Sequence, residues 1–368
     1  MVNVKRMASH LRKFLLLYVF LAILLALPLG YFLTPYFKAN AGLVKNAILC
    51  LAIGTLYPSM IQLKADKLSE EFKSKWKEIA VSLIIIFVIA PAAAMLLAGG
   101  NGNKVVGIGY VAANSVPASS ASVAYVMLAE GNIELATVLV ILSILIALFA
   151  TPTYVGLYAR TVNVSLPIAL LAKSVTIALI VPLVLGQLTR YFLVVRKARN
   201  IVMDPNVKHE CKVRVGTGGS VAETPADIRK AIECLESKLS ARLKPVLSIW
   251  TMTFMLALIF LLIANKAVLL ISKPTLAGYI IGAQLVVYGL IIASLLVASK
   301  VLKMSFEDHM GVAFIAITKN ESVAAAMAVL TIGSAAAIPA ALIPSIQPVI
   351  AILYVSAAPI IRKLLKGM

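Results

Sequence analysis

Two short polar runs interrupt apolar stretches of this chain, and both contain side chains of types that can bind ions. In the second run, residues 318–322, Lys319 and Glu321 are the only Asp, Glu, Lys or Arg residues between positions 311 and 361. A charge near the centre of a bilayer costs about 3 kcal/mol or more, so it persists where it faces a cavity, a partner or a transported ion. We therefore predict a binding site here, with a Lys–Glu pair that only joins two helices as the alternative. The candidate residues are Thr318, Lys319, Asn320, Glu321 and Ser322.

The first polar run, residues 114–122, combines small hydroxyl side chains with a proline and reads NSVPASSAS. Proline removes a backbone donor, and hydroxyl residues can satisfy a broken helix or line a cavity, so we expect a discontinuous helix here. A close seam between two helices would favour the same small residues, and this alternative stays open. The candidate binding residues are Asn114, Ser115, Ser119, Ser120 and Ser122.

The composition indicates a helical membrane protein. Of the 368 residues, 61% are hydrophobic and 13% are charged, and apolar segments long enough to cross a bilayer recur along the chain. The predicted fold class is an all-α polytopic membrane protein with ten transmembrane helices, arranged as two inverted five-helix repeats with broken helices 4 and 9. The predicted spans are residues 14–33, 43–63, 79–98, 105–128, 133–157, 173–194, 246–270, 276–301, 311–331 and 338–361.

The positions of the two polar runs favour the internal repeat. They fall in the fourth and ninth spans, and paired interrupted helices of inverted repeats meet at a binding site. We divide the chain into residues 1–195, the first transmembrane half with an extra sixth span, residues 196–244, a cytoplasmic insert, and residues 245–368, which hold the remaining spans. The insert contains a glycine-rich run at 216–220, interpreted as a linker, and one amphipathic helix that starts near Pro225, a typical first helical residue.

The basic residues indicate the orientation in the membrane. With both termini on one side, the loops of that side hold 26 of the 34 Lys and Arg residues. This asymmetry predicts a multi-pass protein of the cell membrane, in contact with lipid, with both termini and the insert in the cytoplasm. Orientation also explains the net charge of +19, and the basic residues are not interleaved with aromatics for stacking, so we expect no nucleic-acid partner.

The residues that would support catalysis or a metal lie outside the predicted spans. The histidines are His10, His209 and His309, and His209 with Cys211 and the distant Cys234 lacks the spacing of a zinc motif. An intramembrane enzyme would need histidines, paired acids or a metal set within the spans. We therefore predict that the protein is not an enzyme and holds no metal and no cofactor.

Several motifs resemble those of the bile acid:sodium symporter superfamily. Residues 115–122 followed by Leu-Ala-Glu-Gly-Asn at 128–132 are similar to its proline and small-residue motif and the turn that follows. Residues 182–188, PLVLGQL, look like its Pro-x-x-x-Gly pattern, and Tyr57-Pro58 and Lys244-Pro245 resemble its arsenite-permease branch. The resemblance implies a core domain and a panel domain crossed by two broken helices.

This chain departs from that resemblance at positions that matter for ion binding. Where sodium symporters of the family have an Asn and hydroxyl residues, it has Val123, Ala136 and Val140, and of this set only Ser122 matches. The resemblance aligns Asn320 with the family's ninth-span Asn, so that Glu321 follows it. Arsenite permeases carry a Cys where this chain has Ala118.

We therefore expect an ion-coupled secondary transporter that moves a small organic anion or an oxyanion across the cytoplasmic membrane. The alternatives are an arsenite efflux permease, which would confer arsenic resistance, and a non-transporting membrane sensor. The coupling ion is H+ or Na+. Glu321 with Lys319 in the same run favours the proton, because a single carboxyl near a lysine can exchange a proton whereas sodium needs a cage of oxygens. The sequence does not specify an oligomeric state.

Overall fold

The computed structural model describes residues 2–62, 72–119, 122–203 and 225–366, and these residues form helices joined by short connections. Within them, eight helical segments are long and apolar enough to cross a membrane. This confirms the all-α polytopic class, while ten helices and inverted repeats stay predictions. The segments are α2 (Leu15–Ala39), α3 (Ala41–Gln62), α5 to α6 (Trp76–Ala98), α9 (Ile133–Thr161), α10 to α11 (Ile168–Met203), α12 (Pro225–Asn265), α14 (Pro274–Val301) and α17 (Ile338–Ser356).

The other two predicted spans are each interrupted. The fourth consists of α7 (Lys104–Ser115) and α8 (Ser122–Leu128), and the ninth of α15 (Phe306–Ile317) and α16 (Glu321–Thr331). Pro117 follows the end of α7 and has no N–H with which to continue the helix. Short helices complete the described fold: α1 (Val2–Lys13), η2 (Gly99–Asn101), α13 (Ala267–Ser272), η4 (Ser334–Ala337) and α18 (Ala358–Lys366).

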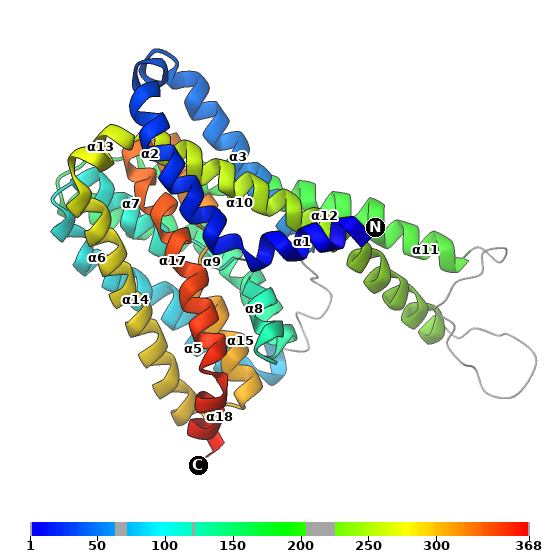
Figure 1. Ribbon diagram of the computed structural model, residues 1–368. Helices are drawn as coiled ribbons and strands as arrows, with labels where there is room; N and C mark the ends of the chain where they lie inside the picture. The colour runs from blue at the N-terminus through cyan, green and yellow to red at the C-terminus, as the bar shows by residue number, and fades with distance from the viewer. Residues whose placement is uncertain (1, 63–71, 120–121, 204–224, 367–368) are drawn as a thin grey trace, which may run out of the picture.

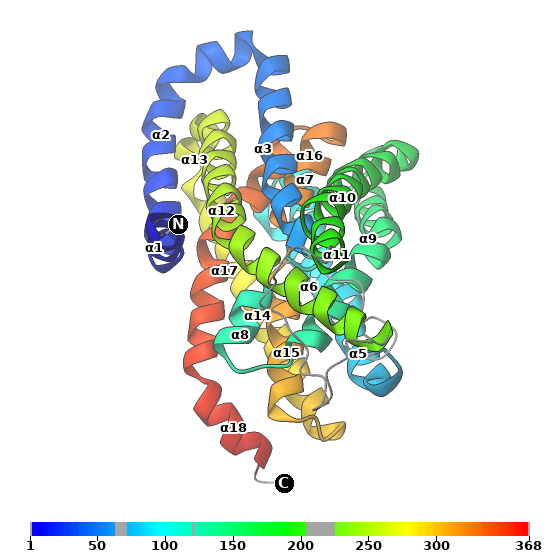
Figure 2. The same ribbon diagram turned by 90° about the vertical axis from the view of Figure 1, so that its right-hand side faces the viewer.

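The long helices pack in two groups (Figures 1 and 2). In one group α12 lies against α2 and α3, and α10 lies against α3. In the other group α7 packs on α6, α9 and α17, while α15 packs on α9 and α14. The groups meet where α10 contacts α9 and where α12 contacts α17, and α16 packs on α3 and α10. Large apolar side chains such as Phe32, Leu96 and Phe149 are exposed on the outside, as expected for helices whose outer surface faces lipid.

The helices continue past both predicted borders of the insert. A single helix, α12, runs for 41 residues from Pro225 through Pro245 to Asn265, so the predicted amphipathic helix and the seventh span are one element. At the other border, α11 (Arg196–Met203) extends the sixth span, packs against α12 and projects with it from the body of the molecule (Figure 1). Arg190 and Glu236 link α10 to α12 at 3.6 Å. The predicted linker at 216–220 lies outside the described residues.

Candidate functional site

The two helix breaks lie side by side. Ala118 and Lys319 form an antiparallel β-bridge. The Ser119 N–H donates to the Thr318 carbonyl, and the Asn320 N–H donates to the Pro117 carbonyl, both at 2.9 Å. The bridge satisfies backbone groups that the broken helices leave without intrahelical partners, which a buried or membrane environment requires. The breaks expected at the fourth and ninth spans are therefore present, and they contact each other.

Hydroxyl groups at this crossing bind one another. The Ser122 hydroxyl donates to the Ser119 carbonyl, and the Thr318 hydroxyl contacts the Ser122 hydroxyl. Thr318 Oγ1 also lies 2.6 Å from the Phe314 carbonyl, in the preceding turn of α15. The Ser143 hydroxyl on α9 accepts a 3.1 Å hydrogen bond from the Ala118 N–H. The crossing is thus held together through side chains as well as through the bridge.

Lys319 is buried, with 3% of its surface exposed. Its ammonium donates a 2.9 Å hydrogen bond to the Ile86 carbonyl and lies 5.4 Å from the centre of the Phe87 ring. Both partners belong to η1 (Ile85–Ile89), a π-helical turn between α5 (Trp76–Ile84) and α6 (Ala90–Ala98). In a π-helix the carbonyl of residue i accepts from residue i+5, and five residues after Ile86 comes Pro91, which has no N–H. Pro91, in the first turn of α6, therefore leaves this carbonyl free for the lysine.

Glu321 is the first residue of α16 and is also buried, with 7% exposed. Among the described residues neither of its carboxylate oxygens has a hydrogen-bond partner, and Lys319 makes no ion pair with it in that part of the chain. Tyr110 on α7 and Tyr288 on α14 are also buried, and their hydroxyls lie next to the Asn114 and Gln284 side chains. Glu321 is therefore a buried carboxylate whose oxygens have no hydrogen-bond partner among the described residues.

The remaining predicted residues have other partners or lie at the edge of the crossing. Asn114 exchanges two hydrogen bonds with Gln284 on α14, at 3.0 and 3.1 Å. The Ser115 hydroxyl bonds to its own helix at Ala112, and its carbonyl accepts from Thr151. Ser322 is buried in the first turn of α16. Ser120 lies outside the described residues.

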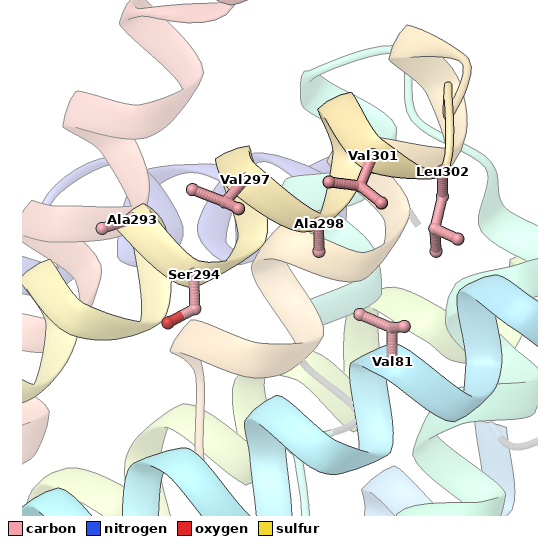
Figure 3. A pocket seen from close by; sticks show the side chains of 7 residues that line it. All are labelled: Val81, Ala293, Ser294, Val297, Ala298, Val301 and Leu302. Atoms are coloured by element: carbon pink, nitrogen blue, oxygen red, sulfur yellow. The ribbon is translucent and has the colours of Figure 1, made fainter.

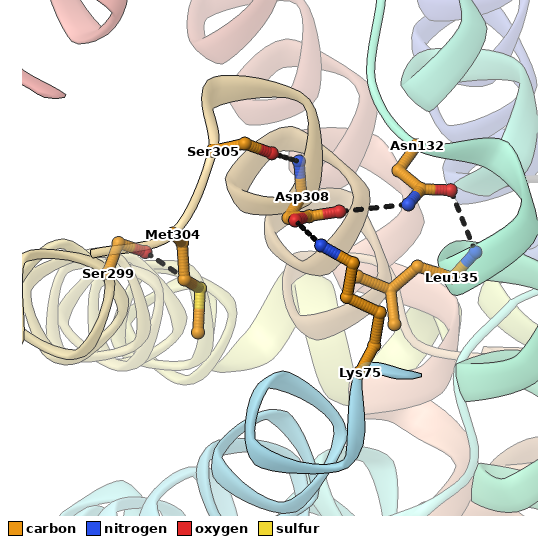
Figure 4. Close-up of polar contacts among 7 residues, drawn as sticks. All are labelled: Lys75, Asn132, Leu135, Ser299, Met304, Ser305 and Asp308. Carbon is orange, nitrogen blue, oxygen red and sulfur yellow. Dashed lines mark hydrogen bonds and ion pairs between the residues drawn. The ribbon is translucent and has the colours of Figure 1, made fainter. Parts of the chain in front are cut away.

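A charged cluster at the start of α15 was not predicted from the sequence (Figure 4). Asp308 accepts from Lys75 at 2.5 Å and from the Asn132 side chain at 2.8 Å. The Asn132 N–H also donates to the Glu307 carbonyl. The turn at 128–132 thus docks on α15, and Gly311 permits the approach because a Cβ there would lie 2.8 Å from the Asn132 carbonyl oxygen.

His309 lies in α15, two residues before the predicted ninth span, and 0% of its surface is exposed. Its two ring nitrogens contact the hydroxyls of Ser299 at 2.6 Å and Tyr354 at 2.7 Å. The imidazole therefore joins α14, α15 and α17, and both of its nitrogens are occupied.

An apolar depression between α5 and α14 contains none of the predicted residues (Figure 3). Val81 lines it from α5 and Val297 and Val301 from α14, with Ser294 as a polar member. Val297 and Val301 are 62% and 74% exposed. This surface has the chemistry of a lipid contact and lacks the charges that would hold an ion.

A comparison with protein families matches residues 48–273 to the Sodium Bile acid symporter family. The chain belongs to this family. The match covers more than half of the 368 residues and includes the first break, while the second break lies beyond it. No individual curated protein matches the chain. Membership of this symporter family agrees with the eight apolar helices among the described residues.

Proposed function

We propose that the protein is an ion-coupled secondary transporter that moves a small organic anion or an oxyanion, with Glu321 as the group that binds the coupling cation. One observation carries the proposal: a carboxylate buried next to a helix crossing has no hydrogen-bond partner among the described residues. An unpaired buried charge costs several kcal/mol, and a bound cation removes that cost. A carboxylate that changes between bound and free states is what ion coupling requires.

The proton is our proposed coupling ion. A proton needs only the carboxyl group, whereas sodium needs several oxygen ligands in addition. Val123, Ala136 and Val140 offer no side-chain oxygen, and Ser122 and Thr318 already bind each other. The description of the family names sodium, so Na+ is the alternative coupling ion.

The crossing also supports an anion as the substrate. Lys319 provides a positive charge there, and once Glu321 has bound a cation the pair has a net charge of +1. An arsenite substrate would favour a thiol, but Ala118 stands at the expected position, and Cys50, the free cysteine among the described residues, is exposed on α3. We therefore place the substrate among the anions.

The test is uptake and efflux in vesicles that contain the purified protein. Taurocholate, pyruvate and arsenite are offered in turn under a proton gradient without sodium and under a sodium gradient without a pH difference. We expect flux of an anion with the proton gradient alone. Flux that needs sodium and ignores pH would make sodium the coupling ion, and no flux of any probe in either direction would favour a sensor. Vesicles without protein give the background.

A further inference from the structure

The contacts of Lys319 are those of a bound cation. A carbonyl that the helix leaves free and the face of an aromatic ring are both ligands for a positive charge. Ile86 provides the carbonyl at 2.9 Å and Phe87 the ring at 5.4 Å. Pro91 keeps the Ile86 carbonyl free of its π-helical partner. The η1 turn therefore presents a cation-binding surface to the crossing.

The backbone of Lys319 is fixed on two sides. Its N–H donates to the Gln347 side chain at 3.2 Å, and its carbonyl accepts from the same amide at 3.5 Å. On the other side the bridge joins it to Ala118. Gln347 lies on α17 and Ala118 in the first break, so contacts to both fix the backbone from which the ammonium reaches η1. The Lys319 charge acts on Glu321, but the ammonium donates to the Ile86 carbonyl. Both Glu321 oxygens have no hydrogen-bond partner among the described residues, so they stay available to a mobile cation.

We propose that the Lys319 ammonium is a built-in cation that fills a cation site at η1, so that the transporter carries one mobile cation with each monovalent anion. This inference rests on the proposed function and adds the charge balance of the cycle. Lys319 contributes +1 and Glu321 −1, and the mobile cation and the anion cancel each other. The loaded site is then neutral, the state that costs least to move through a low-dielectric region.

Replacing the lysine tests the site without a substrate. In Lys319→Gln the ammonium is lost, and the site at η1 is left to a mobile cation, with the new amide oxygen and the Ile86 carbonyl among its ligands. We measure Tm of the purified protein in NaCl and in choline chloride of equal concentration. Sodium should raise Tm by about 2–4 °C more in Lys319→Gln than in the wild type, because a bound ligand stabilises the folded state. Lys300→Gln, which removes an exposed lysine at the end of α14, should respond as the wild type does.

An equal sodium response of Lys319→Gln and the wild type would overturn the inference. If Lys319→Gln does not fold, two further measurements decide. Lys319→Arg keeps the charge and should fold without an added sodium response; a sodium response larger than that of the wild type counts against the built-in cation.

In vesicles with the wild type, a potential imposed with potassium and valinomycin should change taurocholate or pyruvate uptake less than twofold. Acceleration of several-fold by an inside-negative potential means a second positive charge per cycle and overturns the inference, while uptake itself still supports the proposed function. Absence of any anion flux overturns the proposed function instead.

Discussion

At the scale of single residues, Glu321 has two physical roles that pull in different directions. As the first residue of α16 its negative charge interacts favourably with the helix N-terminus. As a buried carboxylate without a hydrogen bond to any described residue it destabilises the fold. A group whose structural contribution is small or negative is retained for function in many membrane proteins. Because the Glu321 charge is expected to support transport and to lower the stability of the fold, one substitution can separate the two effects.

Replacing Glu321 with Gln keeps the size of the side chain and removes its charge. We expect coupled anion transport to fall at least tenfold, which corresponds to about 1.4 kcal/mol of lost coupling, and the free energy of unfolding to stay equal or rise. Transport in vesicles and thermal unfolding in detergent measure the two effects. The matched control is Glu134→Gln, an exposed acid in the first turn of α9. Transport at the wild-type rate in Glu321→Gln would remove Glu321 from the coupling site.

The sequence could identify the polar residues of the crossing but not their partners. The cost of a charge in an apolar segment singles out Lys319 and Glu321 from one stretch of sequence. Lys319 binds the Ile86 carbonyl of η1, 233 positions away along the chain, and the Gln347 side chain of α17, 28 positions away, and only the packing brings these groups close. Pro91 is a feature of the sequence that could have indicated the contact with Lys319. A proline inside a helix has no N–H, so it leaves one carbonyl of the preceding turn without a partner.

At the scale of elements, α7 approaches η4 through a glycine. A Cβ built on Gly109 would overlap the carbonyl oxygen of Ala336 and lie 2.6 Å from its carbonyl carbon. Because the clash is with backbone, no side-chain rotation can relieve it. The approach fixes α7, and with it the first break, against the segment that connects α16 to α17.

Two glycine-to-alanine substitutions distinguish the effect of this close packing on stability from the effect of helix propensity. Gly109→Ala should lower the stability by about 1–3 kcal/mol, the usual cost of overpacking, and should lower transport by displacing α7. Gly282→Ala lies in α14, where a Cβ meets nothing within 4 Å; alanine there should leave stability unchanged or raise it by up to about 1 kcal/mol. Thermal unfolding of both variants is the measurement. Equal stabilities would show that the close approach at Ala336 is absent in the membrane.

The breaks could be predicted at this scale, but the lengths of the elements could not. Pro117 ends α7 by chemistry that is visible in the sequence. Pro245 would end a helix by the same rule, yet α12 continues through it. α12 packs against α2 and α3, and such tertiary contacts override a local preference that the sequence alone displays. The π-helical turns η1 and η3 (Tyr191–Val195) have no such local signal apart from Pro91.

At the scale of the whole molecule, the positions of the basic residues and the lengths of the helices both fit a chain that crosses a bilayer. Lys273 precedes α14 and Lys300 lies in its last turn. The helix has 28 residues, which corresponds to about 42 Å, enough to place the two lysines on opposite sides of a bilayer. The class of fold could be predicted from the composition and from the length of the apolar segments, because segments of this length are typical of transmembrane helices. The arrangement in two packing groups depends on contacts between distant helices and was expected only from the resemblance to a family.

Cysteine labelling can determine the orientation of the protein in the membrane. In a variant without Cys50, Cys211 and Cys234, single cysteines replace exposed lysines: Lys38 and Lys273 on the side predicted to face outwards, and Lys300 and Lys303 on the other side. A maleimide that cannot cross membranes is added to intact cells. We expect it to label the cysteines at 38 and 273 at once and those at 300 and 303 only after the cells are permeabilised, because the basic loops stay in the cytoplasm. The two lysines near the ends of α14 are the matched pair, since they lie on one helix. Labelling of 300 and 303 alone in intact cells would invert the topology, and equal labelling of all four would mean that the charge asymmetry does not set the orientation.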